Sequence, residues 1–256
     1  MDLLFKFTAI LGALAWLPQI INWFINWKQK PQLKIFGDDE AQVGYTTFGC
    51  VFNMNFSFLS KKKMSLIENM TVTVIDKNKT EYLLTWNWYS ETFYELKSPD
   101  SIATMGKQQK AISFVAYKDV LTEKFIGFQI NEFREKTKLL LNKINQQLEN
   151  QKYIGNIDLD SIQKSESYID LMRLYDDSLN WKKGNYSAIC RVYISGMKKP
   201  FEYKFKFNLT ETDISNLKSN INLSKKIIEI SIFSKDKKIE INPLWAIPMV
   251  AKEKEL

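Results

Sequence analysis

The chain has 256 residues, a formal net charge of +7 and no histidine, and only three of its 36 basic residues are arginine. Its length allows one large or two small domains with real cores. Without histidine, Ser-His-Asp and Cys-His nucleophiles are excluded, and two cysteines alone make a structural zinc site improbable. We therefore predict a non-enzymatic protein with no cofactor and no metal. Because phosphate and base recognition favours arginine, nucleic acid is not an expected partner.

The first 27 residues differ from the rest of the chain. Between residues 3 and 27 the only charged side chain is Lys6. About 20 apolar residues span ~30 Å of hydrocarbon as a helix, so residues 1–27 are predicted to form a transmembrane helix in the lipid bilayer. The start is not basic and the exit has no small residues, unlike a cleavable signal peptide. Aromatic residues crowd the exit, as expected at a membrane–water interface: Trp23, Phe24 and Trp27.

Lysines beside the predicted helix indicate its orientation. Lys28, Lys30 and Lys34 follow the helix, whereas Lys6 and the opposing Asp2 lie near its start. Positively charged flanks stay in the cytoplasm. We therefore expect a single-pass protein of the inner cell membrane whose C-terminal domain is cytoplasmic.

Small and amide side chains form one stripe on the predicted helix. Their spacing of 4, 3, 4, 3 and 4 residues places them on a single helical face: Thr8, Gly12, Ala15, Gln19, Asn22 and Asn26. Small residues allow membrane helices to approach closely, and amides can form hydrogen bonds between helices. The stripe predicts self-association. The alternatives are that the two asparagines face water at the headgroups, or that the helices surround a narrow polar path.

Strand patterns follow a basic hinge at residues 28–32 and extend over residues 33–130. Apolar and polar side chains alternate most clearly in residues 50–58, which is typical of a half-buried strand. Further strands are expected around 70–75, 81–89, 110–117 and 124–130, with a hairpin loop at 76–79. In the strand at 81–89, Tyr82, Leu84, Trp86 and Trp88 are predicted to share one face.

The period changes to three or four residues after residue 130. An amphipathic helix is predicted over 131–150 and a second over 160–179, within a helical insertion at 131–183. Strands return in the part from 184 to 247. They are expected at 186–195 and 201–208, followed by a short helix at 212–223 and a hairpin of strands 226–233 and 238–241. Residues 248–256 form a charged tail, which is expected to fray from residue 251.

The predicted fold is therefore mainly β with an α insertion. An N-terminal transmembrane helix precedes an antiparallel β-sandwich, Ig-like or barrel-like, that a helical segment interrupts. The alternative is two small β units bridged by helices. Cys50 and Cys190 lie in predicted strands, so we expect buried thiols.

Few side chains indicate a site. Trp86 and Trp88, with Trp181, could line a ligand pocket, although large aromatic residues also fill β cores. The aromatic residues in 201–208 alternate strictly with charged ones, which favours a half-buried strand over a nucleic-acid platform. Acidic groups at 38–40, 158–160 and 176–177 lack a complete metal-ligand spacing and are expected in solvated turns or helix caps.

Three functions follow from this layout. The first is a membrane-anchored, non-enzymatic protein whose cytoplasmic β domain binds an unknown protein or small molecule. In the second, a sensor–effector, ligand binding clusters the membrane helices and perturbs the bilayer; this layout resembles that of membrane effectors of bacterial defence systems, in architecture only. The third is a membrane-associated enzyme that works without histidine.

Overall fold

The computed structural model describes residues 16–21, 24, 29–98, 101–155, 158–233 and 242–253, without the side chains of 91–106. Its strands are β1 (Gln32–Thr46), β2 (Gly49–Lys61), β3 (Ser65–Ile75), β4 (Glu81–Ser98), β5 (Ser101–Lys110), β6 (Phe114–Ala116), β7 (Leu121–Gln129), β8 (Gly184–Ile194), β9 (Phe201–Leu209) and β10 (Val250–Lys252). Its helices are α2 (Asn131–Ile154), α3 (Leu159–Gln163), α4 (Glu166–Asp177) and α5 (Glu211–Phe233). Residues 16–21 are also helical.

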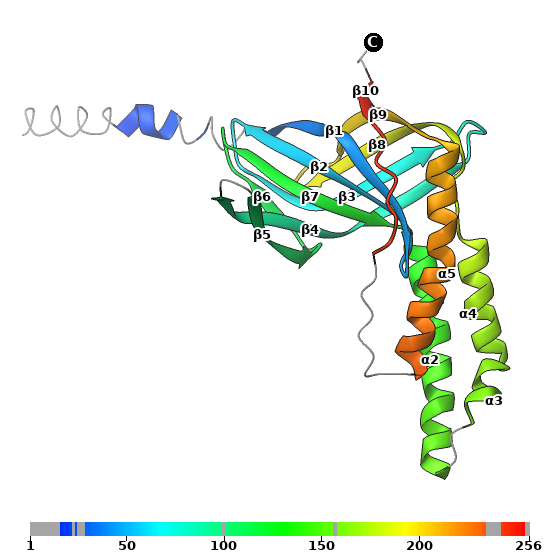
Figure 1. Ribbon diagram of the computed structural model, residues 1–256. Coiled ribbons are helices and arrows are strands. Elements are labelled where there is room, and N and C mark those ends of the chain that lie inside the picture. The colour runs from blue at the N-terminus through cyan, green and yellow to red at the C-terminus, as the bar shows by residue number, and fades with distance from the viewer. Residues whose placement is uncertain are drawn as a thin grey trace, which may run out of the picture.

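The strands form one antiparallel sheet that curls into a nearly closed barrel (Figure 1). Its order is β1-β2-β7-β4-β3-β8-β9-β10, while β5 adds to β4 and β6 adds to β3. The chain's C-terminal segment joins the two edges. Val43 of β1 bridges Ala246, Glu40 bridges Met249, and β10 then pairs with β9. This pairing covers parts of the β1 and β9 edges of the main sheet.

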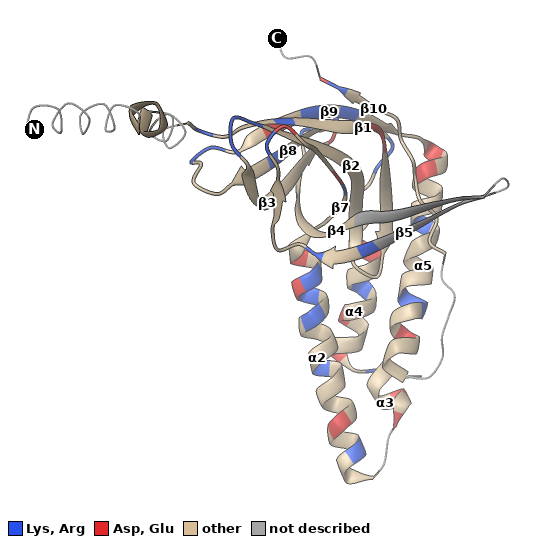
Figure 2. Ribbon diagram, turned by 90° about the vertical axis from the view of Figure 1, so that its left-hand side faces the viewer, with Lys and Arg blue, Asp and Glu red and all other residues tan. Residues whose placement is uncertain are grey.

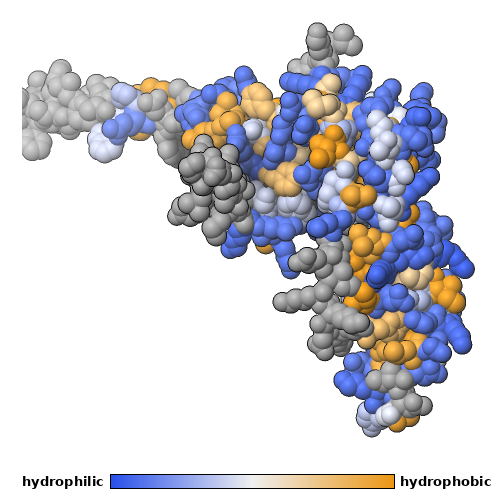
Figure 3. Space-filling view, in the orientation of Figure 1, coloured by the Kyte–Doolittle hydropathy of each residue, from blue (hydrophilic) through white to orange (hydrophobic). Residues whose placement is uncertain are grey.

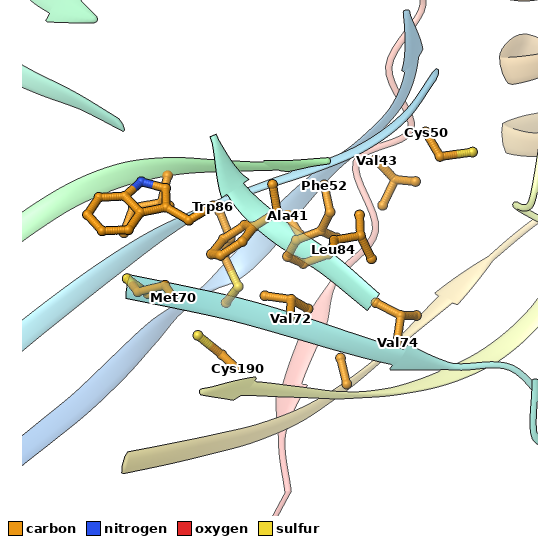
Figure 4. Packing of buried hydrophobic residues seen from close by; sticks show 14 of the residues in the cluster. Ala41, Val43, Cys50, Phe52, Met70, Val72, Val74, Leu84, Trp86 and Cys190 are labelled. Carbon is orange, nitrogen blue, oxygen red and sulfur yellow. The ribbon is translucent and has the colours of Figure 1, made fainter. Parts of the chain in front are cut away.

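Alternate residues of the strands fill the barrel interior. In β2, Phe52, Met54, Phe56 and Phe58 are buried, and the ring of Phe52 lies 5.7 Å from that of Phe205 in β9. Figure 4 shows side chains from β1, β2, β3, β4 and β8 gathered in this interior. The aromatic residues at 201–208 belong to the same core, as predicted. Cys50 and Cys190 are buried free thiols, which confirms that expectation.

The helices α2, α4 and α5 lie together beyond one end of the barrel (Figure 1). Hydrogen bonds hold α4 to the β1–β2 turn: the Tyr45 hydroxyl donates to the Tyr175 carbonyl at 2.7 Å, and the Tyr175 hydroxyl donates to the Thr47 carbonyl at 2.8 Å. The ring of Phe133 in α2 meets that of Tyr175 edge-on, with centroids 5.3 Å apart. The rigid junction therefore fixes the helices relative to the sheet.

Mainly antiparallel β structure with helices is confirmed, and of the two predicted forms the barrel-like one is observed rather than the Ig-like sandwich. Helix 131–150 is confirmed and extends to Ile154. The helix predicted at 160–179 is instead two helices, α3 and α4. They are separated at Ser165, whose hydroxyl caps α4 by accepting from the Tyr168 amide.

Two predictions near the C-terminus are wrong. The strand predicted at 226–233 is the second half of α5, where Ile228 and Ile232, four residues apart, are buried on one helical face. The tail does not fray from residue 251, because β10 pairs Ala251 with Lys206. The second strand of the predicted hairpin, 238–241, lies outside the described residues.

Most of the predicted transmembrane helix also lies outside the described residues. The residues that are not described include every stripe residue except Gln19. They also include the interface aromatics Trp23 and Trp27, and Lys28. Gln19 and Phe24 are helical, and Lys30 and Lys34 are exposed. Within the part of the chain that is described, no helix is both long and apolar enough to cross a membrane.

Candidate ligand cavity

A cavity of about 600 Å³ lies where β4, β5 and β7 meet the β1–β2 turn and the start of α2. Its lining is Phe48, Val51, Trp86, Asn87, Trp88, Gln108, Gln109, Lys110, Ala111, Ile112, Phe128, Gln129 and Arg134. Hydrophilic residues cover most of the visible surface, and orange hydrophobic patches interrupt them (Figure 3). The cavity combines aromatic, amide and cationic groups, the mixture typical of small-molecule sites.

A local irregularity in β4 brings the two tryptophans to this cavity. Trp86 pairs with Phe128 and Trp88 pairs with Gly127, so the register shifts by one residue between them. As a result, Tyr89 rather than Trp88 takes the next buried position. The predicted face with both tryptophans pointing the same way is therefore wrong. Trp88 lies against Gly127. A side chain at position 127 would collide through its Cβ with the indole ring of Trp88.

Amide side chains link the tryptophans to α2. The Arg134 guanidinium donates to the side-chain oxygen Oδ1 of Asn87 at 3.2 Å. The side-chain Nδ2 of Asn87 in turn donates to Oε1 of Gln129 at 3.0 Å. Gln129 is only 2% exposed, and its Nε2 has no hydrogen-bond partner among the described residues. A buried donor without a partner costs about 1–3 kcal/mol. A ligand with an acceptor group could offset that cost after a small shift of the lining.

The charge of the cavity is of one sign. Lys110 and Arg134 line it, and among the residues with described side chains the lining includes no aspartate or glutamate. Both side chains are exposed, so they can reorient toward a bound group. The cavity is therefore suited to an anion or to another strong acceptor.

The sequence-predicted aromatic residues are only partly brought together. Trp86 and Trp88 share the cavity, but Trp181 is buried at the helix junction, where its indole donates to the Gly44 carbonyl at 3.1 Å. Sequence reasoning missed Arg134 and Gln129. The only signal for either was the scarcity of arginine, because Arg134 is one of three in the chain.

Ionisable groups elsewhere have structural roles. A hydrogen bond from Asn55 lowers the pKa of the Asp38 carboxyl, and one from Lys61 lowers the pKa of Asp119. Such carboxylates stay ionised at neutral pH and do not supply a proton. Burial raises the pKa of the Cys50 thiol to about 12, so it is not a thiolate nucleophile. Among the described residues, no group of three or more His, Cys, Asp and Glu side chains could hold a metal ion.

The fold and cavity define a barrel-like, mainly antiparallel β protein with a helical extension. No family model matches the chain, and no curated protein matches it. Among solved structures, a family 123 glycoside hydrolase from Clostridium perfringens, studied for glycolipid glycan hydrolysis, is similar over 71% of this chain. The identity is 12%, the TM-score is 0.32, and the match spans 28% of the hydrolase.

Proposed function

We propose that this chain is a single-pass, membrane-anchored, non-enzymatic protein whose cytoplasmic barrel binds a ligand in the cavity described above. One observation carries the binding half of the proposal. Trp86, Trp88, the Arg134 guanidinium and Gln129, whose Nε2 has no partner among the described residues, all border one 600 Å³ space. Convergent polar groups around an aromatic wall are characteristic of ligand sites.

The anchoring half rests on the sequence. An apolar run over residues 3–27 has the length of a membrane span, and lysines follow it. The two buried, unpaired thiols suit a reducing compartment, which supports a cytoplasmic barrel.

The lining also specifies the chemistry of the ligand. An indole face stacks favourably on a flat ring, and the guanidinium group binds a carboxylate or phosphate through two parallel hydrogen bonds. The ligand is therefore a small molecule with a planar ring and an anionic group. An unknown protein could present the same groups, but the cavity's modest volume favours a small molecule.

The test uses 1-naphthyl phosphate, a flat ring with one phosphate, as the probe. It is titrated by calorimetry into the full chain held in neutral phosphatidylcholine nanodiscs. We expect saturable binding that weakens about tenfold or more in both Trp88→Ala and Arg134→Gln, since a charge-assisted pair contributes about 1.5–3 kcal/mol. Arg173→Gln is the matched control, because Arg173 is exposed on α4 and its only ion pair among the described residues is with Asp170. Equal heats in all four proteins would contradict the site.

The polar stripe favours a second candidate, the sensor–effector. Ligand capture would then cluster the membrane helices through the stripe and disturb the bilayer. Overexpression should be toxic in this case, and Gly12→Ile with Asn22→Leu should abolish both toxicity and association in a membrane two-hybrid assay. The control pair Leu14→Ile with Ile21→Leu, on the opposite face, should leave both unchanged. Unaltered association of the stripe variant would remove the only support for this candidate.

A further inference from the structure

The barrel end opposite the helices gathers four segments, 29–34, 61–64, 117–120 and 195–200, which we call the basic rim. Strand pairing places them together. Gln32 pairs with Lys61 across β1 and β2, and Ser60 bridges Lys118. The Ser195 amide donates to the Leu66 carbonyl at 2.9 Å, which brings the β8–β9 turn to the same end.

The basic rim is charged much more strongly than the rest of the molecule. Its segments hold eight lysines and a single acidic residue, Asp119. The four helices at the other end hold nine basic and eleven acidic residues. Blue loops are visible on the left-hand side of the barrel in Figure 2. The positive charge of the chain is thus concentrated at one end.

These lysines are available to a partner. Lys61 pairs with Asp119 at 2.9 Å. The other seven are exposed and make no ion pair with any described residue: Lys30, Lys34, Lys62, Lys63, Lys118, Lys198 and Lys199. The loops that carry them are fixed, since the Ser60 hydroxyl lies 2.6 Å from that of Ser65 and the Asp119 amide donates to the Ser60 carbonyl. Because the backbone of these loops is already held, binding orders little further backbone.

Exposed apolar side chains lie among the lysines. Met64 and Tyr117 are each 60% exposed, and Val120 is 53% exposed. This mixture of lysines with tyrosine, methionine and valine suits a membrane interface. The apolar side chains can enter the headgroup layer, while the lysines contact anionic lipids. The rim contains no arginine, the residue that nucleic-acid sites prefer.

The position of the proposed anchor brings the rim to the membrane. Leu33 lies six residues after Trp27, and an extended chain spans at most about 3.6 Å per residue, or ~22 Å. Screening at physiological ionic strength acts over about 8 Å. Because β1 begins at the rim, this end is tethered closest to the bilayer, and a linker that is not fully extended lets its lysines come within one screening length of the headgroups. We propose that the basic rim docks on anionic lipid headgroups and holds the barrel upright on the membrane; this rests on the proposed anchor.

The test measures how close each end of the molecule lies to the lipid. A donor dye is attached to Ser195→Cys at the rim or to Asn150→Cys far along α2, both exposed, while the buried Cys50 and Cys190 stay unlabelled. The full chain is reconstituted in vesicles of phosphatidylcholine with or without 30% phosphatidylglycerol and a headgroup-labelled acceptor lipid. We expect energy transfer from position 195 to rise at least about twofold with phosphatidylglycerol, and to fall back in 1 M NaCl. Transfer from position 150 should not rise.

Charge reversal supplies the matched comparison. Four rim changes, Lys62→Glu, Lys63→Glu, Lys198→Glu and Lys199→Glu, should abolish the rise. The same number of changes on the helices, Lys138→Glu, Lys143→Glu, Lys218→Glu and Lys226→Glu, should preserve it. These lysines are also exposed, so the net charge changes equally.

The outcomes separate the two proposals. If the chain resists carbonate extraction but transfer from position 195 is the same with both lipids, the rim proposal fails and the anchor remains. If carbonate removes the chain but it still binds phosphatidylglycerol vesicles through the rim lysines in low salt, the anchor fails and the rim proposal is supported. Equal effects of both sets of charge changes would overturn the rim proposal.

Discussion

Gly49 closes the turn between β1 and β2 with φ of 77°, and a Cβ there would lie 2.7 Å from the ring of Phe133 in α2. Both a left-handed backbone and a collision with the ring therefore oppose any other residue. We expect Gly49→Ala to lower the free energy of unfolding by about 2–4 kcal/mol, measured by chemical denaturation. Gly196, with φ of 74° and open space around it, isolates the backbone cost. Gly196→Ala should cost only about 1–2 kcal/mol; equal losses would mean that Phe133 simply moves aside.

Asp76 connects stability to pH at the β3–β4 turn. Burial raises the pKa of its carboxyl, but the amides of Thr80 and Asn78 donate to it at 2.9 and 2.8 Å and, together with Lys182, bring the pKa below its ordinary value. This stabilisation is complete above about pH 4, the unfolded pKa, and is lost as the pH falls through the folded pKa.

We therefore expect Asp76→Asn to be less stable than the wild type at pH 7 and to show a smaller loss on acidification. Thermal unfolding from pH 7 to pH 2 measures both effects. Asp160→Asn, on an exposed position of α3, is the control and should follow the wild-type curve. Parallel curves for Asp76→Asn and wild type would contradict this account.

Part of the candidate site could be predicted at the residue scale. Large aromatic residues are visible in any sequence, so Trp86 and Trp88 were found. Their opposite placement was not predictable, because the register shift between them depends on β7, a strand about 40 residues away in the sequence. Gln129 is likewise ordinary in sequence, and it is distinguished by its burial and by an Nε2 that has no partner in the described part of the chain.

Asn220 connects two elements, α5 and the C-terminal segment that closes the barrel. It is 2% exposed. Its side-chain Nδ2 donates to the backbone carbonyl of Leu244 at 2.7 Å, and its side-chain Oδ1 accepts from the backbone amide of Leu244 at 3.0 Å. Asn220→Leu would leave two backbone groups without partners. We expect it to cost about 2–4 kcal/mol and to speed amide hydrogen exchange of residues 244–250.

An exposed asparagine on the same helix provides the comparison. Asn222→Leu should alter neither stability nor exchange by a measurable amount, since its side chain faces solvent. Unchanged exchange around Leu244 in Asn220→Leu would show that the bridges of Val43 and Glu40 hold the segment without help from α5.

Elements with a clear period were predictable, and α5 shows the limit. Residues 226–233 are rich in isoleucine, which favours strands locally. Packing overrides that preference, because Ile228 and Ile232 continue the buried face begun by Ile214 and Leu217. By contrast, the strands in which apolar and polar residues alternate were predicted correctly, because this alternation is visible in the local sequence.

Barrel closure belongs to the whole molecule. Val43 meets Ala246 across 203 positions of sequence, and no local pattern encodes such a pairing. Composition and alternation could therefore predict a curled or sandwiched β domain but not its strand order. The same holds for the basic rim, whose four segments are dispersed in sequence and are gathered by the topology.

Carbonate extraction of the full chain tests most directly whether residues 1–27 anchor the barrel in a membrane. Leu11→Lys with Leu14→Lys places two charges in the middle of the proposed span. Each charge makes membrane insertion less favourable by about 2.5–3.5 kcal/mol. Leu83→Lys with Leu159→Lys, at exposed barrel and helix positions, adds the same charge elsewhere. The account predicts that wild type and the latter variant stay in the carbonate-resistant pellet, whereas the mid-span variant moves to the supernatant. Extraction of the wild-type chain, or a resistant mid-span variant, would contradict it.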